Sequence, residues 1–338
     1  MRKTEESKKL ARVFISHASA NLPVALEVQA TLEARFDPWL DQSDIHLGVL
    51  LGKELQQSIA ASELVVLIWS KAAAASRWVA AELLTAYHLD RFIVPCVLSG
   101  DALPQFLSRS VYCDLRRRRG EVLARLAEQL QRAPRARNEF PALQPYEDSE
   151  LTKAIDGICA KQASILARLE SNRVAARELQ AELDPEMRAA EERWRYDPTI
   201  LNLAGYHRKN WYMLRHWEEY CAGRFPADPV LEAGERFFFE TLFVNPLEFS
   251  ALNGLGNILL FQGELYAAEF FVERAVECAR AAGVHYAEAV ADLQLIRSRI
   301  PAPPKVTGTD VRPAKKPQKR RVKPQAAKHT ADSRPPRP

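Results

Sequence analysis

The chain of 338 residues lacks the long apolar runs and paired cysteines that mark membrane-spanning and disulfide-rich proteins. The longest apolar run of its first half, LVVLIW at 64–69, is far too short to cross a bilayer. The charged N-terminal stretch contains no apolar core, so we expect no secretory signal. The five cysteines form no CxxC pair, and none stands at metal-ligand spacing from a histidine. These absences favour a cytoplasmic protein with reduced thiols, no transmembrane segment and no metal site.

Charge is spread unevenly along the chain. Residues 301–338 hold eleven Lys and Arg against two Asp, so the net charge of +4 leaves residues 1–300 at about −5. The same segment has nine prolines and almost no large apolar side chains, which predicts a disordered tail. Its basic residues suit nucleic acid or anionic lipid, but a solubilising tail is the simpler interpretation. We expect no nucleic-acid binding elsewhere in the chain.

Residues 11–132 alternate strand patterns with helical ones, which is typical of a parallel sheet covered by helices on both faces. The central run 64–69 has no polar residue and suits a strand buried on both sides. The predicted strands are 12–16, 36–40, 63–70, 92–98 and 111–115, and the predicted helices are 23–36, 52–62, 76–89 and 119–132.

Beyond this domain the pattern becomes helical throughout. After an N-terminal extension (1–10) and the α/β domain, we expect a linker (133–148), a long helical segment (149–193) broken at Pro185, helical repeats (194–300) and the basic tail (301–338). Within 247–283, small and apolar residues recur at the positions of the tetratricopeptide repeat, namely Phe249, Leu252, Leu255, Gly256, Ala268 and Ala275. This region resembles that family, which implies a surface for a protein partner.

Polar side chains follow the predicted strands where a parallel sheet binds its ligands, at the carboxyl edge. Trp78 and Glu82 stand four residues apart in a helical stretch and should therefore share one face. No glycine-rich phosphate loop accompanies them. The first strand ends in Ser16, His17, Ala18 and Ser19, the second in Asp41, Gln42, Ser43 and Asp44, and the third in Ser70, shortly before Ser76, Trp78 and Glu82.

Four successive segments resemble the boxes of the Toll/interleukin-1 receptor (TIR) domain. They are VFISHAS (13–19), WLDQSDIHLG (39–48), SIAASELVVLIWS (58–70) and SRWVAAEL (76–83). The resemblance covers about residues 10–132 and implies a flavodoxin-like fold. It also implies one of two activities, because many bacterial and plant TIR domains cleave NAD at the nicotinamide–ribose bond, whereas many animal ones only assemble.

The resemblance also implies roles for single residues. Ser76, Trp78 and Glu82 fit the S-x-W-x-x-x-E setting of the cleaving enzymes, with Glu82 catalytic. Val79 replaces the cysteine that is common after the tryptophan, and the loop after the second strand lacks its frequent proline. Substrate-lining positions fall on Ser16, His17, Ala18 and Ser43, the last where a related enzyme has an acidic residue, and the assembly loop contains Gly48 and Leu50.

The chemistry needs few groups. Cleavage of an N-glycosidic bond to a cationic pyridinium builds positive charge on the ribose, which one carboxylate can stabilise. The leaving nicotinamide departs neutral, so no second carboxyl acid is required. Simpler interpretations remain open: Glu82 as a salt-bridge residue, Trp78 as core filler and His17 as a plain loop residue.

The TIR resemblance therefore implies an NAD+ nucleosidase of bacterial anti-phage defence. It would release ADP-ribose or a cyclic ADP-ribose signal, with NAD+ as substrate, no cofactor and a homo-oligomer formed through TIR domains. The rival hypothesis is a non-enzymatic TIR scaffold that recruits partners through its repeats.

Overall fold

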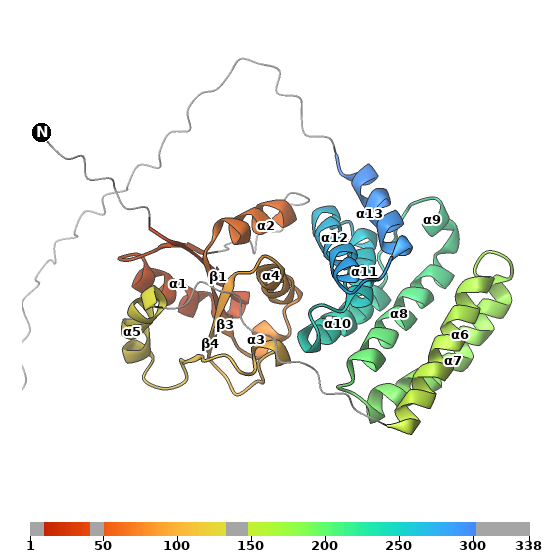
Figure 1. The fold of residues 1–338 in the computed structure, drawn as a ribbon, viewed down its shortest axis with the longest axis horizontal. Coiled ribbons are helices and arrows are strands. Elements are labelled where there is room, and N and C mark those ends of the chain that lie inside the picture. The colour runs from red at the N-terminus through yellow and green to blue at the C-terminus, as the bar shows by residue number, and fades with distance from the viewer. Residues whose placement is uncertain (1–9, 41–50, 133–147, 302–338) are drawn as a thin grey trace, which may run out of the picture. The chain divides into compact units, whose positions relative to one another are not determined.

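Five short segments form one sheet in the computed structural model, which describes residues 10–40, 51–132 and 148–301 (Figure 1). The strands are β1 (Arg12–Ser16), β2 (Asp37–Leu40), β3 (Leu64–Trp69), β4 (Phe92–Val97) and β5 (Cys113–Asp114). All neighbouring strands pair in parallel, in the order β2-β1-β3-β4-β5. The predicted α/β class with a flavodoxin-like strand order is confirmed.

The alternation of side chains along the strands sorts them into two cores. Val13 and Ile15 of β1 pack with α1 (Leu22–Leu32) and α5 (Arg119–Arg132) on one face of the sheet. Phe14, between them, points to the opposite core. That second face is covered by α2 (Leu51–Ala61), α3 (Lys71–Ala74) and α4 (Arg77–His88). Since β3 contributes residues to both cores, its lack of polar residues is explained.

The rest of the described chain is all helical, as predicted. We call α6–α13 the helical region; its elements are α6 (Ser149–Arg168), α7 (Arg173–Arg193), α8 (Pro198–Arg215), α9 (Trp217–Cys221), α10 (Pro229–Val244), α11 (Phe249–Phe261), α12 (Leu265–Ala281) and α13 (Ala287–Arg299). Several of its helices begin where an aspartate or asparagine side chain accepts backbone N–H groups of the first turn. These capping residues are Asp148, Asn172, Asp197 and Asp228. The tetratricopeptide identity of the region stays a prediction.

The predicted break at Pro185 is wrong, because α7 runs through this residue. Proline removes one backbone hydrogen bond from a helix, but packing on both sides of it compensates here. Leu183 and Met187, the residues two positions away on either side, are completely buried. The interruption lies instead between α6 and α7, where the Asn172 side chain accepts from the Ala175 N–H at 3.1 Å and starts the new helix.

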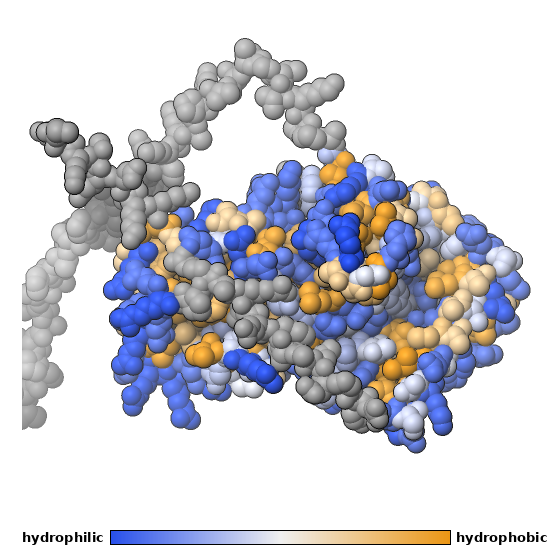
Figure 2. Space-filling view, viewed as in Figure 1, coloured by the Kyte–Doolittle hydropathy of each residue, from blue (hydrophilic) through white to orange (hydrophobic). Residues whose placement is uncertain are grey.

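Several predicted segments lie largely or wholly outside the described residues: the extension 1–10, the linker 133–148 and the tail 301–338. Within the described residues, no helix combines the length and apolar character that crossing a membrane requires. Figure 2 shows hydrophilic side chains over most of the visible face, interrupted by smaller apolar patches.

Close packing of α11 against α12 depends on a glycine. A Cβ atom added to Gly256 would lie 2.3 Å from Cγ2 of Val272 and 3.2 Å from the Ala268 carbonyl oxygen. Val272 and Ala268 are both fully buried, so neither has free space to move into. This close approach accounts for a glycine in the middle of an otherwise apolar helix.

We predict that Gly256→Ala destabilises the protein by about 1–3 kcal/mol, because it overpacks this contact. Gly157 is the matched control, since it lies in the exposed part of α6 and a Cβ there would meet nothing within 4 Å. Gly157→Ala should be neutral or stabilising by up to about 1 kcal/mol, because alanine is the better helix former. Urea unfolding of both variants checks the prediction, and equal midpoints would contradict it.

Candidate functional site

Helix α4 follows strand β3 after one short helical turn, so its first residues lie at the carboxyl edge of the sheet. The Ser76 side chain accepts a hydrogen bond from the Val79 N–H at 3.3 Å and caps the helix. Ser70 caps the preceding turn in the same way, accepting from the Ala73 N–H at 3.1 Å. The predicted site residue Ser76 therefore has a structural role that its sequence position did not reveal.

Trp78 and Glu82 lie one turn apart on α4, as their spacing predicted. Glu82 is only 3% exposed, whereas Trp78 is half-buried. The turns from Val79 to Tyr87 are buried almost all round, including Leu83, Leu84 and Ala86. The carboxylate thus sits in an apolar helix that is covered on more than one side, a setting in which electrostatic interactions are strong.

The segment after β1 meets the end of β3 at the same edge. The Ser70 hydroxyl donates to Oδ1 of Asn21 at 2.7 Å, which ties the turn after β1 to the end of β3. Strand order reverses between β1 and β3, which is the place where open parallel sheets bind ligands. Ser70 was expected at this edge as the end of the third strand, whereas Asn21 was not.

The predicted residues of β1 lie at this junction. Ser16 is fully buried, and within the described residues its Oγ makes no hydrogen bond. His17 is half-buried, and Ala18 is 8% exposed. Three other predicted positions, Ser43, Gly48 and Leu50, lie outside the described residues. The site assignments themselves stay predictions.

Arg77, next to Trp78, is a residue that sequence analysis missed. Its Nε donates to Oε1 of Glu235 on α10 at 3.0 Å, and its Nη2 donates to Oε1 of Gln262 at 2.8 Å. Gln262 in turn donates to Oε2 of Glu235 at 3.1 Å, which closes a hydrogen-bonded ring of three side chains, Arg77, Glu235 and Gln262. We call it the Arg77 ring. The Arg77 guanidinium also lies 5.0 Å from the centre of the Trp78 ring. The sequence signal was an arginine at the start of a helix that is otherwise nearly all apolar.

The Glu235 carboxylate in this ring is almost completely buried, with 4% of its side chain exposed. Burial raises the pKa of Glu235, while the adjacent Arg77 charge opposes that shift. A buried carboxylate of this kind needs its cation and its hydrogen bonds, because an unpaired charge in the interior is costly. The Arg77 ring is therefore a specific contact between α4 and the helical region.

A second contact joins the helical region to α2. The Gln56 side chain donates to the Tyr266 carbonyl oxygen of α12 at 3.0 Å, and the Lys53 ammonium lies 5.5 Å from the Tyr266 ring centre. Gly52 approaches the same place closely, since a Cβ there would lie 3.6 Å from Cβ of Tyr266. The helical region thus contacts both α2 and α4.

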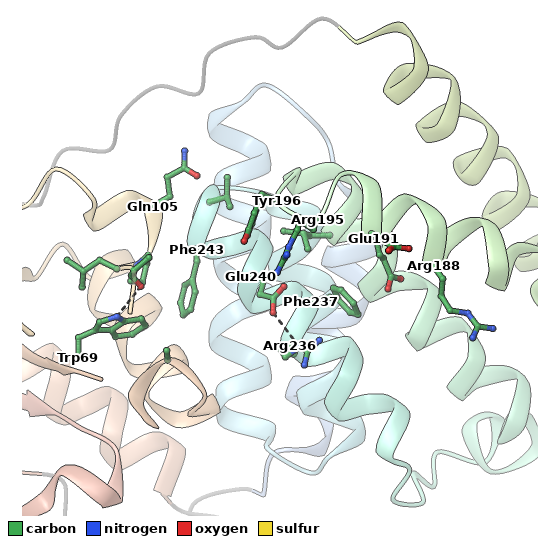
Figure 3. Close-up of a pocket in the computed structure, with 17 residues that line it drawn as sticks. Trp69, Gln105, Arg188, Glu191, Arg195, Tyr196, Arg236, Phe237, Glu240 and Phe243 are labelled. Atoms are coloured by element: carbon green, nitrogen blue, oxygen red, sulfur yellow. Dashed lines mark hydrogen bonds and ion pairs between the residues drawn. The ribbon is translucent and has the colours of Figure 1, made fainter. Parts of the chain in front are cut away.

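A cavity of about 840 Å³ opens between the end of β3 and helices α7 and α10 (Figure 3). Trp69 lies on its sheet side, where its indole N–H donates to the Ala102 carbonyl at 3.1 Å. From α10 the cavity is lined by Phe243 and by an ion pair in which Nε of Arg236 lies 3.4 Å from Oε1 of Glu240. Burial raises the pKa of Glu240. Neither Trp78 nor Glu82 lines this cavity, so it is separate from the predicted site.

Metal ligands are not assembled in the described ranges. In residues 10–40, 51–132 and 148–301, no three His, Cys, Asp or Glu side chains lie close enough to hold an ion. Cys96 and Cys113 lie side by side on paired strands β4 and β5, both as free thiols. Hydrogen bonding to Cys113, together with burial, raises the pKa of Cys96, so this thiol stays protonated.

The parallel sheet, its strand order and the carboxylate-bearing helix at its carboxyl edge define an α/β domain of the flavodoxin-like class. A family model described as the TIR domain matches residues 13–133, and this part of the chain is a TIR domain. Comparison with curated proteins and with solved structures gave no match.

Proposed function

We propose that the TIR domain of this protein is an NAD+ glycohydrolase with Glu82 as its catalytic residue. The observation that carries the proposal is the pair of Trp78 and Glu82, one turn apart on α4 beside the β1–β3 junction. Additional support comes from Ser16, whose buried hydroxyl has no hydrogen-bond partner among the described residues and could bind a polar group of the substrate.

Glu82 would act through charge rather than as an acid. As the nicotinamide–ribose bond lengthens, positive charge grows on the ribose ring, and a carboxylate in apolar surroundings stabilises it strongly. Water, or a nitrogen of the adenine base, then attacks the ribose carbon. The first attack gives ADP-ribose, and the second gives a cyclic isomer. NAD+ is the substrate in both cases, and no further cofactor enters the scheme.

The exposed part of Trp78 would hold a flat base by stacking, which positions the ribose over Glu82. His17 and Ala18 would line the same edge. We place this activity in the cytoplasm, in a defence response that depletes NAD+ or produces a signal, with a protein partner of the helical region as its trigger.

The rival function is a scaffold without enzymatic activity, which the large helical region favours. The two functions differ in one measurement, the release of nicotinamide from NAD+ by the purified full-length protein. Chromatography that resolves nicotinamide, ADP-ribose and cyclic products tests both. A folded protein that releases none at any concentration would favour the scaffold.

We predict that Glu82→Gln lowers the rate of nicotinamide release by about 10²-fold or more, because the amide keeps the shape and removes the charge. Glu121→Gln is the matched control, since Glu121 is an exposed residue of α5 on the opposite face of the sheet. Circular dichroism verifies that both variants fold. A folded Glu82→Gln protein with the rate of the control would refute the catalytic assignment.

Variants of Trp78 distinguish a ring that stacks on the substrate from a ring that only packs in the core. If its ring stacks on the base, Trp78→Ala should lower activity or change the product ratio more than it lowers the melting temperature, and Trp78→Phe should retain part of the activity. Rates per folded molecule and thermal melts of the three proteins decide the matter. An early melt with normal activity per folded molecule would mean that the ring only fills space.

We also predict that specific activity rises with protein concentration, because the TIR resemblance implies a site completed by a neighbouring subunit and association follows mass action. Rates should be measured across an about hundredfold dilution, together with light scattering to record the oligomer. A specific activity that stays constant over that range would show that one chain contains the whole site.

A further inference from the structure

The helical region contacts the TIR domain at α2 and at α4, the helix that carries Trp78 and Glu82. Arg77, at the start of α4, is bound by Glu235 and Gln262, and Gln56 of α2 is bound by Tyr266. Helices α2 and α4 also pack against each other on the same face of the sheet. We call these contacts the seam.

In this arrangement the carboxylate of Glu82 is enclosed. Only 3% of the surface of Glu82 is exposed. A substrate can therefore reach it only if the groups that cover it move, and α4, which carries it, packs against α2. Both helices are attached to the helical region, so their spacing depends on the seam.

The specific contacts of the seam are polar, although an apolar core is continuous across the boundary. These contacts are hydrogen bonds and one ion pair, which water can replace once they are exposed. The cavity of about 840 Å³ lies elsewhere on the boundary between the TIR domain and the helical region. It is lined from the helical region by six charged side chains, so that part of the boundary is not closely packed. Apolar contact is made at places such as Trp69 with Phe243, whose ring centres are 6.5 Å apart. Boundaries of this mixed character commonly allow relative motion.

We propose that the seam is an autoinhibitory clamp: the helical region holds α2 and α4 together through Tyr266 and the Arg77 ring, and its release opens Glu82 to the substrate. Arg77 is the positioning residue, because it links Glu235 to the turn that carries Trp78. The proposal rests on the proposed NAD+ cleavage, and its tests include a measurement that does not depend on activity.

A reversible cross-link tests the clamp directly. Cβ atoms at positions 52 and 266 would be 3.6 Å apart, within the range that a disulfide spans. The double variant Gly52→Cys with Tyr266→Cys should form a disulfide on mild oxidation, visible as a mobility change on a non-reducing gel. Oxidised protein should cleave NAD+ at least about fivefold more slowly than the same protein after reduction.

The two single variants, treated identically, control for oxidation of the native cysteines and for the substitutions themselves. An oxidised double variant that is as active as its reduced form would overturn the proposal. Failure of the disulfide to form in the folded protein would overturn it as well, because the seam would then not hold these residues together.

Removing the seam contacts that the helical region contributes should have the opposite effect on the rate of NAD+ cleavage. Glu235→Ala combined with Gln262→Ala leaves every TIR residue in place and should raise the rate of nicotinamide release at least about fivefold. Arg297→Ala is the matched control, since Arg297 bridges Glu269 and Glu273 at 2.8 Å within the helical region and away from the seam. An unchanged or lower rate in the double variant would contradict the clamp.

Hydrogen–deuterium exchange of Arg77–His88 and Leu51–Ala61 provides the measurement that is independent of activity. The double variant should exchange faster in both helices than the Arg297→Ala control, and the oxidised cross-linked protein should exchange more slowly. If these changes occur while no variant releases nicotinamide, the clamp stands and the proposed NAD+ cleavage fails. If exchange is the same in all proteins, the clamp fails whatever the activity.

Discussion

The structure depends on the burial of helix α4 between the sheet and its outer neighbours. A helix that is apolar nearly all round must be covered on more than one side, and here the sheet covers one side while α2 and α10 contact others. The apolar core on this face of the sheet is accordingly continuous with the core of the helical region. The TIR domain and the helical region therefore share a boundary at the helix that carries Glu82.

Burying a charged group at this boundary costs free energy unless the group is paired, so each buried charge requires a particular partner. Glu235 is buried, and its two oxygens are bound by Arg77 and Gln262. Replacing such a pair by apolar residues is often tolerated, whereas removing one member leaves the other unpaired. A polar ring of this kind adds little net stability but defines which helix faces which, and the bidentate shape of arginine suits that purpose. Through Glu235 and Gln262 the ring links α10 and the end of α11 to the first turn of α4.

Much of the fold was predictable because its signals are local. The strand β1 was predicted with its observed bounds, and β3 with one extra residue at each end, since runs of β-branched residues between turn signals have few alternatives. The spacing of Trp78 and Glu82 placed them on one helix for the same reason. The helix break expected at Pro185 was wrong, because helix propensity is a weak guide where tertiary packing on both sides holds a helix together. Ser76 was predicted as part of the S-x-W-x-x-x-E setting, and its side chain also caps the helix.

The sequence by itself determined the class of the domain, the order of its elements and the helix on which the candidate carboxylate lies, because periodicity and turn chemistry act over a few residues. Only the tertiary structure decided that Glu82 is buried, that Ser70 reaches Asn21, and that Arg77 is bound by residues more than 150 positions away. Such contacts depend on how whole layers pack, and a chain contains many arginines and glutamates that could pair equally well. Which glutamate an arginine pairs with depends on the distance between them in the fold rather than on residue type. That distance is set only when the sheet and the helices pack.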